Sequence, residues 1–174
     1  PAEAAAWLAR LQPAEVLMPG DSADPSLRAT VHGCGAAVTH RPDWHFDTAL
    51  GQRKLCEQLQ VATLAGYGAQ DLGAAHAAAA ALLAYAEHTQ SQALLHVRTL
   101  RVEDASALVA LPPATLRTLE LVQTLRGERE PTLLSLLDTC TTGMGSRLLR
   151  QWLLNPRRER GDAIQRHDAL SALM

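Results

Sequence analysis

The stretch TGMGSRLLRQWLLNP, residues 142–156, decides how the second half of the chain folds. Met144, Leu148 and Trp152 recur every four residues, which places them on one face of a helix. A threonine precedes this helix as a cap, and the final proline ends it. With Leu153 beside it, this stripe is expected to face a core. Truncating Trp152 to alanine would then cost ~3–5 kcal/mol.

Other residues of the stretch belong to the same predicted packing element. Gly145 lies in the first turn of the helix. Arg147 and Arg150 fall on the side opposite the stripe. We expect these arginines to be solvated, or paired with Asp138 or with a neighbouring domain.

The glycines Gly143 and Gly145 do not have the sequence of a phosphate-binding loop. A P-loop reads GxxxxGK[ST], because its lysine contacts phosphates and its hydroxyl contacts the metal. No lysine follows here, and Arg147 lies two residues after the second glycine. A second pair, GYG at 66–68, is followed by Asp71 where the dinucleotide fingerprint needs glycine, and that charge repels pyrophosphate. The sequence therefore predicts no nucleotide or other cofactor site in this chain.

Composition argues against several classes of function. The 174 residues carry a formal net charge of −2 and only three Trp, two Tyr and one Phe, so strong phosphate-backbone binding and a base-stacking platform are not expected. No apolar run approaches the ~18–20 residues of a membrane span, and no signal peptide is recognisable. The three cysteines form no CxxC pair, which suits a reducing compartment. We expect a cytoplasmic protein without membrane association.

No group of side chains has the spacing of a metal or catalytic site. Cys34, His40 and His45 lie six and five residues apart, which matches no common zinc pattern. Loop or edge positions are the better interpretation of these three residues. Asp47 before Thr48 is typical of a helix N-cap. Neither a bound metal nor catalysis is expected.

Periodicity divides the chain into an α/β part and an all-helical part. Helices are predicted over 2–11, 25–32, 47–60 and 72–90, and short apolar runs predict strands at 15–18 and 36–39. The tracts 96–102 and 107–111 predict extended segments or a hairpin-like connector. Further helices are predicted over 113–125, 132–139, 144–154 and 160–174. We place domains at 1–92 and 113–174, with a linker at 93–112.

Several segments together resemble the MutS family of DNA mismatch-repair proteins. The core-domain signature of that family reads LLD-x4-PMGxRxLxxWLxxP, and this chain has LD at 137–138, MGSRLL at 144–149, WL at 152–153 and a closing proline. LRTLEL at 116–121 is similar to the family's TxxNLEI helix and IQRHDAL at 164–170 to its IxxRQxAI segment. LQPAEVL at 11–17, RPDWHF at 41–46 and LLAYAEHTQ at 82–90 resemble its connector domain. Gly143 replaces the usual proline, which predicts a more mobile first turn, and Thr118 replaces an asparagine.

The resemblance implies a partial ribonuclease-H-like α/β connector domain without nuclease activity, followed by the first helices of the core, or lever, domain. It also implies a longer protein, with the mismatch-reading Phe-x-Glu motif, the clamp and the P-loop ATPase outside this chain. Full-length relatives bind mismatched double-stranded DNA as dimers, use ATP with Mg²⁺ to become sliding clamps, and recruit MutL. The present segment is then non-catalytic and couples the ATPase to the DNA-binding domains.

The resemblance implies, in addition, a MutL-docking surface on the helix at 47–60. Its facing positions are Gln52, Arg53 and Lys54, and related bacterial proteins can carry glutamines at the last two. A solvated charged face is the alternative interpretation. Three other classes of protein stay open: a recombination-type MutS homologue, a generic helical scaffold with chance similarity, and a ribonuclease-H-like nuclease with converging carboxylates.

Overall fold

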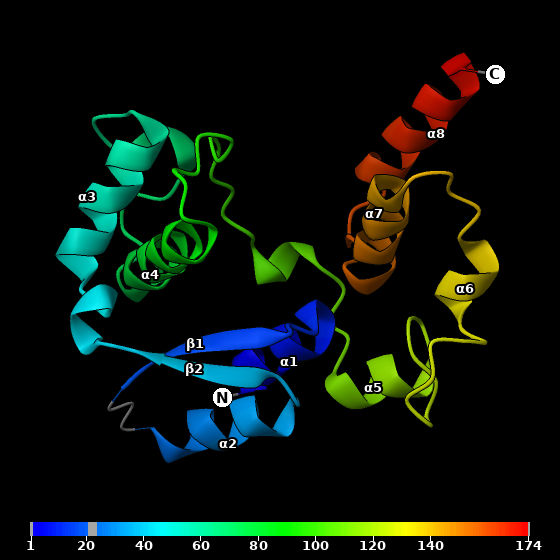
Figure 1. The fold of residues 1–174 in the computed structure, drawn as a ribbon. Helices are drawn as coiled ribbons and strands as arrows, with labels where there is room; N and C mark the ends of the chain where they lie inside the picture. Colours follow the sequence, from blue (N-terminus) through cyan, green and yellow to red (C-terminus); the bar gives the residue numbers. More distant parts are fainter. Residues whose placement is uncertain (1, 21–23, 174) are drawn as a thin grey trace. The chain divides into compact units, whose positions relative to one another are not determined.

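The computed structural model describes residues 2–20 and 24–173 (Figure 1). The chain divides into two compact units. One is continuous, Pro13–Glu103, and the other combines the residues up to Gln12 with those from Asp104 onward. The predicted fold class is confirmed, because a small parallel sheet with helices precedes an all-helical segment. Among the described helices, none has the length and apolarity needed to cross a bilayer.

The continuous unit begins with a β–α–β motif. Strands β1 (Glu15–Pro19) and β2 (Ala37–Arg41) pair in parallel, and helix α2 (Pro25–Gly33) forms the crossover between them. Asp24 caps α2, since its carboxylate accepts hydrogen bonds from the backbone amides of Ser26 and Leu27, at 2.9 and 3.3 Å. In Figure 1, α2 lies against one face of the pair.

Two helices and two short 3-10 turns complete this unit. They are η1 (Asp43–Phe46), α3 (Thr48–Leu59), η2 (Ala65–Tyr67) and α4 (Ala74–Gln90). Helices α3 and α4 pack side by side. The core beside them is formed by the buried residues Leu55, Leu64 and Ala69, with half-buried apolar side chains around them.

A polar contact joins α4 to the sheet. The Tyr85 hydroxyl donates to the Glu15 carboxylate at 2.7 Å, and the Thr39 hydroxyl donates to the same oxygen. The Thr39 bond, and then the Tyr85 bond, lower the pKa of Glu15, while the bond to Glu15 raises the pKa of Tyr85. The Arg41 guanidinium lies 5.7 Å from the Tyr85 ring centroid. Residues from β1, β2 and α4 thus share one hydrogen-bonded cluster.

The second unit is helical. It contains α1 (Ala2–Leu11), η3 (Ala105–Ala107), α5 (Pro113–Thr118), α6 (Leu133–Leu137), α7 (Gly143–Leu154) and α8 (Gly161–Leu173). Its buried apolar side chains include Leu108, Leu116 and Leu154. An antiparallel bridge pairs Leu108 with Arg157, directly after α7. This unit therefore has a thin core.

Of the two predicted alternatives for the tracts 96–102 and 107–111, extended segments or a hairpin-like connector, the hairpin is wrong. In the part of the chain that the structure describes, the tract 96–102 forms no strand. Nearby carbonyls, those of Leu94 and Val97, accept hydrogen bonds from the Gln58 side chain instead. The tract 107–111 pairs only through its bridge at Leu108. Alternation of apolar residues specifies a face, and it does not specify a partner strand.

The predicted helix 113–125 ends early, at Thr118. Glu120 adopts a left-handed backbone conformation with φ of 45°, which a continuing helix does not allow. Its carboxylate accepts a hydrogen bond from the Leu125 amide at 2.6 Å, so the chain turns there. The helix predicted over 132–139 is shorter as well, α6, and begins with a capping box formed by Thr132 and Ser135.

Candidate functional site

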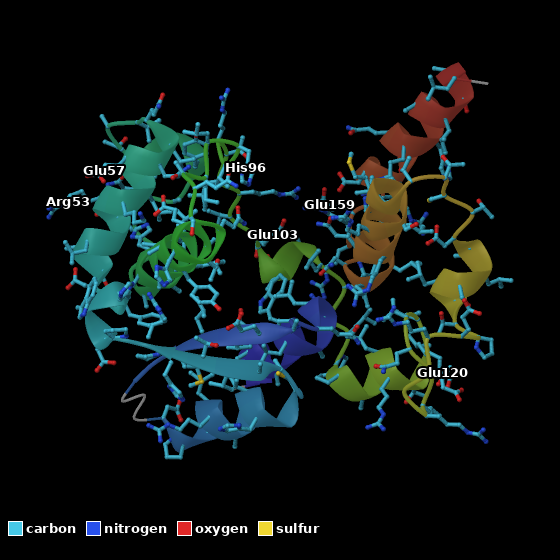
Figure 2. The ribbon with its side chains drawn as sticks, in the orientation of Figure 1. Arg53, Glu57, His96, Glu103, Glu120 and Glu159 are labelled. Atoms are coloured by element: carbon cyan, nitrogen blue, oxygen red, sulfur yellow. The ribbon has the colours of Figure 1, made fainter. Side chains whose placement is uncertain are left out.

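The candidate site is the outward face of α3, formed by Leu50, Arg53 and Glu57 and called the α3 face below. Their spacing of three and four residues places them on one side of the helix. All three are exposed, Leu50 to 48 %. Arg53 and Glu57 point away from α4 (Figure 2). Arg53 has no ion-pair partner among the described residues.

Local sequence fixes both ends of α3. The Asp47 carboxylate accepts a hydrogen bond from the Leu50 amide at 2.8 Å, as predicted for an N-cap. At the other end, Gln60 takes the left-handed conformation with φ of 56°, which stops the helix. The expected helix over 47–60 is therefore confirmed, with caps at its first and last residues.

A glycine lets α3 approach the backbone of α4. A Cβ atom on Gly51 would lie 2.7 Å from both the carbonyl carbon and the carbonyl oxygen of His76, and 2.8 Å from the amide nitrogen of Ala77. Those atoms belong to backbone and cannot rotate away, so no larger residue fits without separating the helices. His76 is buried, and its Nε2 lies 2.6 Å from the carbonyl oxygen of Ala69.

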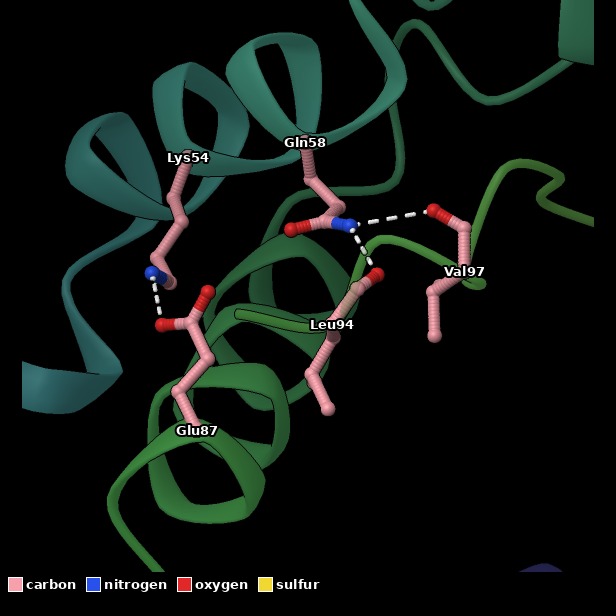
Figure 3. Close-up of polar contacts among 5 residues, drawn as sticks. All are labelled: Lys54, Gln58, Glu87, Leu94 and Val97. Carbon is pink, nitrogen blue, oxygen red and sulfur yellow. Dashed lines mark hydrogen bonds and ion pairs between the residues drawn. The ribbon is translucent and has the colours of Figure 1, made fainter. Parts of the chain in front are cut away.

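Two polar side chains of α3 hold the same pairing from its flank (Figure 3). The Lys54 ammonium forms an ion pair with the Glu87 carboxylate of α4 at 2.7 Å. The Gln58 amide donates to the carbonyl oxygens of Leu94 and Val97, at 2.8 and 3.0 Å. Both contacts connect α3 to α4 or to the segment that follows it. The α3 face thus stands on a helix fixed along its length.

The three residues predicted for docking do not share one environment. Arg53 is exposed, Gln52 is half-buried, and Lys54 is engaged by Glu87. The ion pair could not be read from the sequence, because its members lie 33 positions apart. Whether any of the three binds a partner stays a prediction.

Sequence reasoning gave no role to Trp44 beyond the family resemblance. This residue lies in η1, just before α3, and is 66 % exposed. Its ring centroid is 3.9 Å from that of His45, with the planes tilted by 33°. Burial, and then the nearby Arg41, lower the pKa of His45. The sequence signal that could have singled out Trp44 was its position in a short segment just before a capped helix.

The apolar stripe of α7 is not the core that the sequence predicts. Met144 is 77 % exposed, Trp152 is 40 % exposed and Leu148 is exposed as well, whereas Leu153 is half-buried. The buried residue of the helix is Leu154, at 2 % exposure. The interpretation of Trp152 as core is therefore wrong for this chain. Periodicity identifies an apolar stripe, but the residues that cover it must come from elsewhere.

The polar residues at the start of α7 bond locally. Asp138 accepts hydrogen bonds from the Ser146 hydroxyl and the Cys140 amide, both at 3.1 Å, and these lower the pKa of its carboxyl group. The Asp138 hydrogen bond raises the pKa of the Cys140 thiol. Arg147 donates to the Gly143 carbonyl at 3.0 Å, and among the described residues it forms no ion pair with Asp138.

Two further contacts concern the same helix. A Cβ on Gly145 would lie 3.1 Å from that of Cys140, so this glycine serves a close approach. The Arg166 guanidinium of α8 lies 4.0 Å from the Trp152 ring centroid and covers part of the exposed indole. Whether these residues serve as lever packing stays a prediction.

The candidate metal ligands have separate local partners. The Cys34 thiol donates to the Val31 carbonyl, and His40 Nδ1 lies 3.3 Å from the Pro19 carbonyl oxygen. Across residues 2–20 and 24–173, no three His, Cys, Asp or Glu side chains gather as a metal ion would require.

Two protein-family models match the chain. Residues 2–98 match the model described as MutS domain II, and residues 114–174 match the model described as MutS domain III. The first match alone covers more than half of the 174 residues.

Proposed function

The chain belongs to the MutS family of DNA mismatch-repair proteins, and we propose that it presents the α3 face to MutL and relays the state of the family's ATPase between domains. In this proposal the chain is a non-catalytic part of a cytoplasmic bacterial protein. That protein binds mismatched double-stranded DNA as a dimer and becomes an ATP-dependent sliding clamp. The observation that carries the docking role is the exposed Arg53 on a helix fixed to α4.

Composition of the α3 face favours a protein partner. Arginine is enriched at the energetic centre of protein interfaces. Arg53 needs no release from an internal ion pair before it binds, because no described carboxylate engages it. Leu50 beside it offers apolar surface, and Glu57 supplies a charge at the rim.

Rigidity of α3 supports the same role. Gly51, Lys54 and Gln58 each hold the helix through a separate contact. A surface that is already ordered loses little conformational entropy when a partner binds. We therefore expect MutL to meet the α3 face in the conformation seen here.

Nucleotide binding is proposed to lie outside this chain. Gly143 and Gly145 are in the first turn of α7, where the Thr142 hydroxyl already accepts from the Gly145 amide at 3.1 Å. The Gly143 carbonyl accepts from Arg147. These groups are used within the helix and do not fit the phosphates of ATP or its Mg²⁺ ion. Titration calorimetry of residues 1–174 with ATP is expected to show no heat of binding.

Charge reversal at Arg53 tests the docking role. In the full-length protein, Arg53→Glu should weaken MutL binding at least about thirtyfold, the effect of losing a hot-spot residue. Arg28→Glu is the matched control, because Arg28 is exposed on α2 of the same unit. Lys54 is left intact, since its reversal would break the ion pair with Glu87. Equal MutL affinity for the Arg53 variant and the wild type would overturn the proposal.

A recombination-type MutS homologue is the second candidate function, because the matches to MutS domains II and III identify the family and do not distinguish its branches. The sequence of the whole gene separates the two, since repair proteins carry a Phe-x-Glu motif near the start. The family matches favour membership over chance similarity of a helical scaffold. Metal-dependent DNA cleavage by the isolated chain would instead support a nuclease.

A further inference from the structure

Helix α1 belongs to one family domain by sequence and to the other unit by packing. Its residues lie within the match to MutS domain II, residues 2–98. In the structure it is part of the unit that contains residues from Asp104 onward, and it packs on α5, which lies almost wholly in the match to MutS domain III. The chain leaves this unit after Gln12 and returns at Asp104.

Arg10 is the centre of the α1 contact. The residue is only 7 % exposed, and its guanidinium donates to the Val109 carbonyl at 2.9 Å. The guanidinium also lies 5.6 Å from the ring centroid of Trp7, one turn earlier on α1. No carboxylate among the described residues pairs with it, and its Nε atom has no hydrogen-bond partner.

The acceptor of that bond is itself part of a fixed segment. The Val109 amide donates to the Pro156 carbonyl at 2.8 Å, and the Arg158 amide donates to the Ala107 carbonyl at 3.0 Å. Residues 107–109 are thus joined to the chain that follows α7. A second side-chain bond, from Arg150 of α7 to the Gln12 side chain, reaches the end of α1.

We propose that the contacts of α1 hold MutS domain II to domain III. We call this set of contacts the latch, and Arg10 is its central residue. Three contacts form the latch: the packing of α1 on α5, Arg10 on Val109, and Arg150 on Gln12. This inference deepens the proposed relay of the ATPase state and rests on it; it is independent of MutL docking.

The environment of Arg10 favours a contact that can open. A buried guanidinium loses its hydration, and here one carbonyl and one aromatic ring replace it in place of a carboxylate. The unpartnered Nε adds to the cost of burial. The docked state therefore has only a modest advantage over a released one. A small change of free energy elsewhere in the protein can shift the balance between them.

Hydrogen exchange of the full-length protein tests the latch. Arg10→Ala removes the hydrogen bond to the Val109 carbonyl and the packing on Trp7. Amide exchange in peptides from 2–11 and 105–111 should then quicken about 10- to 100-fold, as expected for loss of a hydrogen bond from a charged donor. Peptides from α3 should keep the wild-type rate. Arg126→Ala is the control, because Arg126 is exposed in the same unit and has no ion pair with a described residue.

Unchanged exchange in 2–11 would overturn the proposal. If Arg10→Ala instead quickens exchange throughout the chain, exchange is measured in Arg10→Lys. This variant keeps the positive charge on a side chain with a shorter reach. Local quickening in that variant supports the latch, and wild-type exchange overturns it.

A functional readout separates the latch from the docking proposal. The ratio of mismatched-DNA affinities with and without ATP should fall at least about threefold in Arg10→Ala, while MutL affinity stays at the wild-type value. An unchanged ratio in a variant whose α1 is released would refute the latch without affecting the MutL proposal. The Arg53→Glu variant should bind MutL more weakly and keep the wild-type ratio of mismatched-DNA affinities.

Discussion

Replacing Gly51 by alanine tests the geometry that holds the α3 face. The added Cβ would lie 2.7 Å from two backbone atoms of His76, whereas ordinary contacts begin at 3.4 Å. Restoring an ordinary contact therefore requires that α3 move away from α4 by about 0.7 Å, the difference between these two distances. A shift of that size also lengthens the Lys54–Glu87 pair and the two Gln58 bonds.

The expected change in stability is a balance of two terms. Overpacking against backbone costs about 3 kcal/mol, the upper part of the usual range, because neither helix backbone can rotate aside. Alanine gains about 1 kcal/mol over glycine within a helix. The net loss is then about 2 kcal/mol, which lowers the unfolding temperature by about 4–8 °C in a chain of this length.

Urea unfolding followed by circular dichroism measures this difference, with Gly33→Ala as the matched control. Gly33 lies at the end of α2, and nothing is within 4 Å of the position where its Cβ would stand. The control should be neutral or slightly more stable. If Gly51→Ala unfolds at the same urea concentration as the wild type, or a higher one, the close approach of α3 and α4 is not what fixes the helix.

Three further variants address single contacts. Glu87→Gln should reduce stability by about 0–1 kcal/mol, since the Lys54–Glu87 pair is about one-third exposed; a loss above 2 kcal/mol in urea unfolding would contradict this. Trp152→Ala should cost about 1–2 kcal/mol instead of the ~3–5 kcal/mol of a core residue, as judged by the same assay. Asp138→Asn should lower the unfolding temperature at pH 7. Because the pKa of Asp138 is lowered in the fold, its contribution is present above the unfolded pKa and lost as pH falls below about 4. A difference between variant and wild type that persists at pH 2 would disprove this cause.

Local chemistry made the helix starts predictable. Asp47 and Thr142 each cap the helix that the sequence assigned to them. A cap needs only a side chain and an amide two or three residues away, so the necessary information lies in one short stretch. The two strands and the crossover helix followed from the same kind of pattern.

Features that depend on distant partners were not predictable. The sequence showed the stripe with Trp152, and it could not show that this chain leaves the stripe exposed. Likewise, no pattern near Lys54 indicated Glu87, and nothing around Gly51 indicated the backbone of His76. The sequence thus placed the predicted docking residues on one helix, while their division into exposed and engaged residues came from tertiary contacts.

The discontinuity of the helical unit has a consequence for the order of folding. The Arg10–Val109 bond spans 99 positions and the Gln12–Arg150 bond spans 138. Closing loops of that length is slow, whereas the continuous unit between them closes through nearer contacts. During synthesis α1 leaves the ribosome before the surface on which it packs, because that surface follows it by about 100 positions. We therefore expect nascent chains to carry α1 undocked and protease-sensitive until residues beyond α7 have been translated.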